Sequence, residues 1–81
     1  MAYKERDTVV LVRDVPEHSL RAGDLGAVVH VYSPKRFEVE FIRASGQTQA
    51  LVMLEDADLR GVRDQDLIAV RQVDQQVGGA I

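Results

Sequence analysis

The sequence has no cysteine and only two histidines among its 81 residues. Without cysteine the chain has no disulfide, no thiolate metal ligand and no thiol nucleophile. A zinc site takes three or four protein ligands, and His18 and His30 stand without partners at a ligand spacing. We therefore expect no metal and no cofactor, and a fold that is held together by its apolar core.

Long apolar runs and an excess of positive charge are absent as well. No stretch approaches the roughly 20 apolar residues that cross a bilayer, and residues 3–8 are polar and charged, unlike the apolar core of a signal peptide. The sequence therefore predicts a cytoplasmic protein without membrane contact. The 13 acidic and 10 basic side chains give a net charge of -3. Strong nucleic-acid binders usually carry a basic excess, so the charge balance argues against a nucleic-acid partner.

The chain does contain short strand-forming segments separated by turn residues. Residues 37–42 alternate most clearly, with Phe37, Val39 and Phe41 on one face and Glu38 and Glu40 on the other, as a half-buried antiparallel strand requires. Strands are predicted at residues 7–14, 27–32, 37–42, 49–54 and 67–71. Five strands about ten residues apart indicate a small all-β barrel or sandwich. Residues 1–71 form the single expected domain, and residues 72–81 a flexible tail.

A glycine-bounded turn precedes the second predicted strand. Gly23 and Gly26 flank Asp24 and Leu25 directly ahead of residues 27–32. Glycine takes positive φ angles, or lets another chain pass close to its backbone, without a steric penalty. The Asp24 carboxylate can accept hydrogen bonds from nearby backbone amides. We expect Gly23, Asp24 and Gly26 to reverse the chain onto the first strand, and we find no phosphate-loop signature around them.

The order of these pieces resembles a bacterial family filed as domain of unknown function 4926. The resemblance covers about residues 7–54 and, less clearly, continues to residue 70. It is carried by Asp7-Thr8-Val9, Val15-Pro16, Leu20, Gly23-Asp24-Leu25-Gly26-Ala27-Val28-Val29, Tyr32, Glu38-Val39-Glu40-Phe41 and Gly46. It implies an SH3-like barrel of about five antiparallel strands with a 3-10 turn before the last strand. The glycine turn is also similar to the KOW motif of ribosomal and transcription-factor barrels. The resemblance implies no catalytic residue.

Catalytic constellations are weak throughout the chain. Glu38 and Glu40 lie about 7 Å apart along one strand, a separation that suits paired-carboxylate hydrolysis but that every alternating acidic strand shares. Ser19, Ser33 and Ser45 have no adjacent base. The acidic cluster of residues 55–58 lacks the spacing of a calcium loop and is better suited to capping a helical turn. We therefore expect a protein that is not an enzyme.

Two runs that are apolar at every position indicate a contact surface. Residues 9–12 read Val-Val-Leu-Val and residues 51–54 read Leu-Val-Met-Leu, whereas a single-layer sheet needs apolar side chains on one face only. A contiguous apolar patch on the other face is typical of a binding surface. The predicted function is a non-catalytic protein-interaction module, by analogy an antitoxin-like or accessory subunit, with another protein or a second copy as partner. The predicted interface consists of Val10, Val12, Leu51, Met53, Glu38 and Glu40.

The alternative is a KOW-like RNA- or ribosome-associated domain. Lys35, Arg36 and Arg43 flank the third predicted strand, and Phe37 is next to the first two. Basic side chains with an aromatic ring could contact phosphates and stack on a base. Glu38 and Glu40 on the same strand would repel phosphate, and this makes the alternative the weaker of the two.

Overall fold

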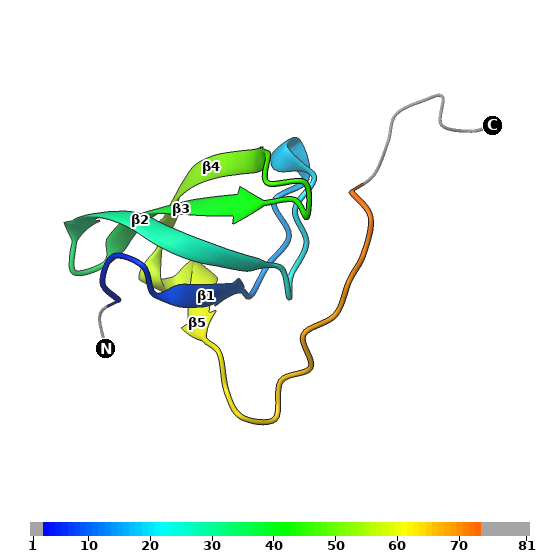
Figure 1. The fold of residues 1–81 in the computed structure, drawn as a ribbon. Helices are drawn as coiled ribbons and strands as arrows, with labels where there is room; N and C mark the ends of the chain where they lie inside the picture. The colour runs from blue at the N-terminus through cyan, green and yellow to red at the C-terminus, as the bar shows by residue number, and fades with distance from the viewer. Residues whose placement is uncertain (1–2, 74–81) are drawn as a thin grey trace.

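A computed structural model describes residues 3–73 of the chain, and these residues form one antiparallel sheet (Figure 1). Its five strands and two short 3-10 turns follow the order β1 (Thr8–Leu11), η1 (Pro16–His18), β2 (Leu25–Ser33), β3 (Arg36–Ile42), β4 (Thr48–Glu55), η2 (Asp56–Asp58) and β5 (Leu59–Gly61). The described residues contain no α-helix. The all-β prediction is therefore confirmed.

The strand order in the sheet is β4-β3-β2-β1-β5, with every neighbouring pair antiparallel. β5 has three residues and pairs with β1 alone, so within residues 3–73 no ladder joins β5 to β4. The sheet is accordingly open, with β4 and β5 as its edges, and is not closed into a barrel. Two register shifts in the β2–β3 ladder, at Val29 and Tyr32, mark irregularities of the kind that bend a strand.

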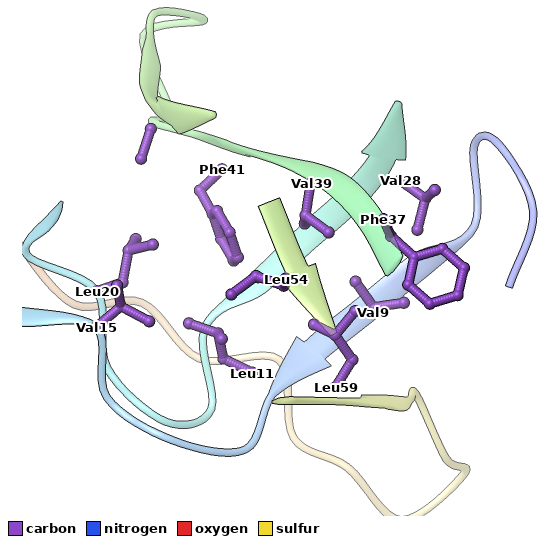
Figure 2. Packing of buried hydrophobic residues seen from close by; sticks show 11 residues of the cluster. Val9, Leu11, Val15, Leu20, Val28, Phe37, Val39, Phe41, Leu54 and Leu59 are labelled. Atoms are coloured by element: carbon purple, nitrogen blue, oxygen red, sulfur yellow. The ribbon is translucent and has the colours of Figure 1, made fainter. Parts of the chain in front are cut away.

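The core follows from the alternation in β3. Phe37, Val39 and Phe41 are at most 3% exposed, while the two glutamates between them are half-buried. Side chains from all five strands converge on this row (Figure 2). The Tyr3 ring packs edge-on against Phe37, with ring centres 5.4 Å apart. The buried cluster contains Val9, Leu11, Val15, Leu20, Val28, Phe37, Val39, Phe41, Ala50, Leu54 and Leu59.

The long connection between β1 and β2 has structure of its own. Val15 and Leu20 exchange backbone hydrogen bonds of 3.0 and 3.1 Å around η1, and both side chains are buried in the core. Pro16 occupies the start of η1, where its missing N–H costs nothing. This loop therefore extends the core beyond the strands and covers one end of the sheet.

The last strand is not where the sequence places it. We predict it at residues 67–71, but β5 comes eight residues earlier, at Leu59–Gly61, and residues 67–71 have no regular secondary structure. Leu59 fills the core at 6% exposure and pairs with Leu11, so tertiary contacts, and not strand propensity, determine the position. The predicted 3-10 turn before the last strand is confirmed as η2. Asp58 caps it by accepting a 2.9 Å hydrogen bond from the Glu55 backbone N–H.

Gly23 and Gly26 meet different structural requirements. Gly23 has φ +97°, in the region that favours glycine, and its N–H donates to the Leu11 carbonyl at 2.8 Å. Asp24 accepts a 2.7 Å hydrogen bond from the Arg21 N–H through its carboxylate. Gly26 is already in β2 and buried, where a Cβ would lie 2.5 Å from Val39 Cγ1. One glycine therefore supplies a turn, and the other leaves room for the core.

Candidate protein-interaction surface

The outer face of β2, β3 and β4 brings four of the six predicted interface residues together. Glu38 pairs with Met53 across the β3–β4 ladder, and Glu40 pairs with Leu51. On the other side, His30 of β2 pairs with Glu38. Because directly opposed residues share a face of the sheet, the apolar pair lies along the β4 edge, beside the two acids. We call Glu38, Glu40, Leu51 and Met53 the outer-face patch.

The outer-face patch is accessible and acidic. Leu51 and Met53 are 51% and 53% exposed, whereas the side chains that alternate with them turn into the core. Thr48 donates a hydrogen bond of 2.5 Å to Glu40 Oε2 and orients that carboxylate. Glu38 has no ion-pair partner among residues 3–73. The patch therefore presents apolar surface with adjacent negative charge.

The two predicted residues on β1 lie elsewhere. Val10 is 4% exposed and belongs to the face of β1 away from the core cluster, opposite Arg60 of β5. Its side chain is therefore not on an accessible contact surface. Val12 follows β1 and is 44% exposed. Of the four apolar residues predicted for the interface, only the two on β4 lie beside the acidic pair.

The basic residues of the RNA alternative do not form one patch. Lys35 and Arg36 are at the β2–β3 turn, while Arg43 follows the far end of the seven-residue strand β3, roughly 20 Å away from the strand rise. Arg36 is paired with Glu55 at 3.2 Å, and Arg43 donates to Gln49 at 2.8 Å. Phe37 is fully buried, so its ring has no face for a base to stack on.

A second feature, which the sequence reasoning missed, is the segment after β5. Residues 62–73 leave the sheet and return beside it toward the end that carries η1 (Figure 1). With Val10, Leu25 and Phe41, among others, this segment lines an open hollow of about 1110 Å³. The available signal was the apolar run of residues 67–70 between Asp66 and Arg71, which we assigned to a strand.

Two arginine–aspartate pairs hold this segment in place. Arg60 donates from Nη1 and Nη2 to the two carboxylate oxygens of Asp66, both at 2.9 Å. Arg71 donates from Nε and Nη2 to Asp24, at 2.9 and 2.6 Å, and also from Nη2 to the Ser19 carbonyl at 3.0 Å. Such two-pronged pairs fix geometry better than single contacts do.

The carboxylates of these pairs are electrostatically stabilised as anions. The hydrogen bond from Arg60 and the Arg63 backbone N–H lower the pKa of Asp66 from 3.8 to about 2. For Asp24, burial would raise the pKa, but the Arg71 guanidinium and the Arg21 N–H outweigh burial, and the net shift is downward. Both aspartates therefore carry full negative charge at neutral pH, so both pairs persist there.

Neither a cluster of possible metal ligands nor a long apolar helix occurs among residues 3–73. Among residues 3–73, no three histidine or acidic side chains are close enough to hold an ion. Within the same range, no helix has the length and apolar character to span a bilayer. The predicted tail of residues 72–81 lies outside the described residues from residue 74 onward.

Comparison with known proteins gives one match. The sequence model of the family described as Domain of unknown function (DUF4926) matches residues 5–61, from the residues just before β1 to the end of β5. No curated protein and no solved structure matches the chain. The matched region includes the outer-face patch and ends before Asp66.

Proposed function

This chain belongs to the family described as Domain of unknown function (DUF4926), and we propose that it acts as a non-catalytic protein-interaction module. The description names no activity, so the proposal is based on the surface of this chain. Its main support is the pair of large apolar side chains, Leu51 and Met53, that stand half exposed on an edge strand beside two carboxylates.

The proposed partner segment is apolar with flanking basic residues. Leu51 and Met53 would be covered by apolar side chains, while Glu38 and Glu40 favour lysine or arginine at the border. The net charge of -3 adds a long-range attraction for a basic partner. β4 is also an edge of the sheet that residues 3–73 form, and a strand of the partner could add to it.

Covering the apolar pair supplies enough free energy to measure. Burying the remaining half of each side chain contributes about 1 kcal/mol, or about 2 kcal/mol for the pair. That corresponds to about 30-fold in affinity. A variant with Leu51→Ser and Met53→Ser together should therefore lose at least this factor in binding.

We further propose that the fold is an incompletely closed relative of the SH3-like barrels. The order in which β1 lies between β2 and β5, together with a 3-10 turn directly before β5, supports this relation. Such barrels serve many functions, so the relation does not itself assign a partner. The KOW-like RNA alternative has lost its aromatic contact, because Phe37 is buried.

The test compares three forms of the tagged chain in a pull-down from host lysate that is read by quantitative mass spectrometry. The forms are wild type, the Leu51→Ser/Met53→Ser variant, and Val62→Ser as a control at 43% exposure outside the outer-face patch. We expect the wild type and Val62→Ser to enrich the same one or more proteins equally, and we expect the double variant not to enrich them. Thermal melts establish that all three forms are folded.

Nuclease treatment and salt separate the alternatives. A contact made by apolar side chains should survive nuclease treatment. In about 0.5 M salt the amount of bound partner should stay close to the amount bound in low salt, because screening weakens only the charged border. If the enriched proteins are the same with all three forms, the outer-face patch is not the binding surface. If they disappear with nuclease, the chain binds RNA.

A further inference from the structure

Residues 67–70 display four consecutive apolar side chains in solvent. Leu67, Ile68 and Val70 are 92%, 66% and 97% exposed, and Ala69 between them is exposed as well. A run of this length outside the core is unfavourable in a soluble protein unless something covers it. The outer-face patch, by comparison, shows about half of each apolar side chain.

The backbone of the same residues is also free. Within residues 3–73, no backbone hydrogen bond joins residues 67–70 to another part of the chain. Isoleucine, valine and leucine favour strands, and this run was the basis for predicting the last strand here. The structure therefore presents a strand-forming segment whose backbone groups find no hydrogen-bond partner, and whose side chains stay exposed, among residues 3–73.

Both ends of this segment are fixed. Arg60 and the Arg63 N–H hold Asp66 at one end, at 2.9 and 2.7 Å, and Asp24 holds Arg71 at the other at 2.6 Å. A segment anchored at both ends loses less conformational entropy when it is bound than a free tail loses. The apolar run is therefore presented on the molecule at a defined place.

From these observations we propose that residues 67–70 pair with the same residues of a second copy of this chain, as an antiparallel two-stranded ribbon about a two-fold axis. The segment has the properties that its partner must have: strand-forming side chains, apolar surface and unpaired backbone groups. Such an interface, formed by the same patch on both subunits, is the commonest kind in homodimers. This proposal does not depend on the outer-face patch.

Charge selects the second copy and the direction of pairing. The segment begins at the acidic Asp66 and ends at the basic Arg71. An antiparallel arrangement brings the end of each copy that carries Asp66 near the end of the other copy that carries Arg71, so opposite charges lie near each other at both ends of the ribbon. A parallel arrangement would place like charges side by side, which is destabilising.

Two-fold symmetry, together with the greatest overlap of residues 67–70, limits the register to two possibilities. A two-fold axis perpendicular to an antiparallel ribbon passes between a residue and its own copy, so either Ile68 faces Ile68 or Ala69 faces Ala69. Opposed Cα atoms in such a ribbon are about 4.5–5.5 Å apart, within the range of about 4.4–6.8 Å that a disulfide spans. A single cysteine at the facing position should therefore cross-link.

The absence of native cysteine makes this experiment clean. Four single variants, Leu67→Cys, Ile68→Cys, Ala69→Cys and Val70→Cys, are oxidised mildly and resolved on a non-reducing gel. Met53→Cys, at 53% exposure in the outer-face patch, is the matched control. We expect either position 68 or position 69 to form the dimer at least about tenfold faster than Met53→Cys, because only a self-facing residue meets the disulfide distance.

The association of the unmodified chain is measured by light scattering after size exclusion. Interfaces this small are weak, so the range runs from roughly 10 µM to roughly 1 mM. We expect a concentration-dependent species of twice the 9.0 kDa chain mass, which Ile68→Lys returns to monomer. At dilutions where both forms are monomeric their melting temperatures should be equal, because Ile68 is exposed there.

Three results would overturn the proposal. A wild-type monomer over the whole concentration range excludes the second copy and points instead to a strand from another protein. A dimer that Ile68→Lys leaves intact uses a different surface. Equal cross-linking at Met53 and at residues 67–70 reflects random collision.

Discussion

Replacing Gly26 by alanine tests the packing of β2 against β3 most directly. An added Cβ would lie 2.5 Å from Val39 Cγ1 and 2.8 Å from Phe41 Cε2, whereas carbon atoms normally approach to about 3.5–4.0 Å. Val39 is fully buried and Phe41 is 3% exposed, so neither side chain can move without displacing its neighbours in the core. The variant therefore forces the β2 and β3 backbones apart or their side chains out of their rotamers.

The expected cost can be stated in numbers. Overpacking by one carbon costs about 1–3 kcal/mol, and the loss of backbone freedom in the unfolded state returns about 0.4–1 kcal/mol of that. We expect Gly26→Ala to be less stable by about 1.3 kcal/mol, and by at most about 2.6 kcal/mol. For a domain of this size the central value lowers the melting temperature by about 5–10 °C.

The matched control is Gly61→Ala in β5. An added Cβ there has no neighbour within 4 Å, and its φ is not positive, so we expect a change of at most about 0.5 kcal/mol. Urea unfolding followed by circular dichroism gives both values, with the midpoint shifting at constant slope. The free energies of unfolding of Gly26→Ala and Gly61→Ala are then compared. If they differ by less than about 0.5 kcal/mol, which is the usual effect of a surface substitution, the close packing inferred for β2 on β3 is wrong.

Three further predictions concern the core, the turn and the C-terminal segment. Phe37→Ala should lower the free energy of unfolding by about 3–5 kcal/mol, which is most of the stability of a domain of this size. Its circular dichroism spectrum at 25 °C should therefore be largely that of an unfolded chain. A cooperative melt like that of the wild type would contradict the central place of Phe37 in the core. Gly23→Ala should lower the free energy of unfolding, measured with urea, by about 1 kcal/mol, because alanine is strained at the Gly23 φ of +97°. An unchanged free energy of unfolding would show that the turn adapts. Since the pKa of Asp66 is lowered from 3.8 to about 2, its ion pair stabilises the segment above pH 3.8 and is lost as the pH falls toward 2. A carboxyl-carbon NMR titration should give a midpoint near 2, and a midpoint at or above 3.8 would refute the pair with Arg60.

Local patterns in the sequence were sufficient to assign residues to faces in a strand that has one buried face. The alternation in β3 placed Phe37 and Glu38 on opposite faces, and the structure has them there. The apolar run at residues 9–12 was ambiguous, because pattern alone does not say which side of β1 is covered. Val10 is buried on the face opposite the core, where it is paired with Arg60 of β5, 50 residues later in the chain, and no local pattern contains that pairing.

The displaced last strand has the same kind of cause. Leu59–Gly61 is too short to show a period of two, and one of its residues is glycine, which strands disfavour. It is a strand because the chain leaves η2 beside β1, and Leu59 meets Leu11 there. Residues 67–71 have the better composition for a strand but meet no free edge of their own sheet. Propensity therefore predicted a strand where the structure has none, because a strand also needs a free edge with which to pair.

Each ion pair that anchors the C-terminal segment joins one residue inside the family match to one residue beyond it. Arg60 and Asp24 both lie within residues 5–61, which match the family, while Asp66 and Arg71 lie beyond them. Asp24 also accepts the hydrogen bond that pins the turn before β2, so the same carboxylate positions the turn and the segment 47 residues later. Because Arg60 lies in β5 and Asp24 in the turn directly before β2, the segment can be held in place only once the sheet has formed. An Asp24→Asn variant should therefore loosen the turn and the segment together, whereas Asp66→Asn should loosen the segment alone. Backbone amide exchange at Arg21, whose N–H donates to Asp24, and the NMR order parameter at Ile68 distinguish the two.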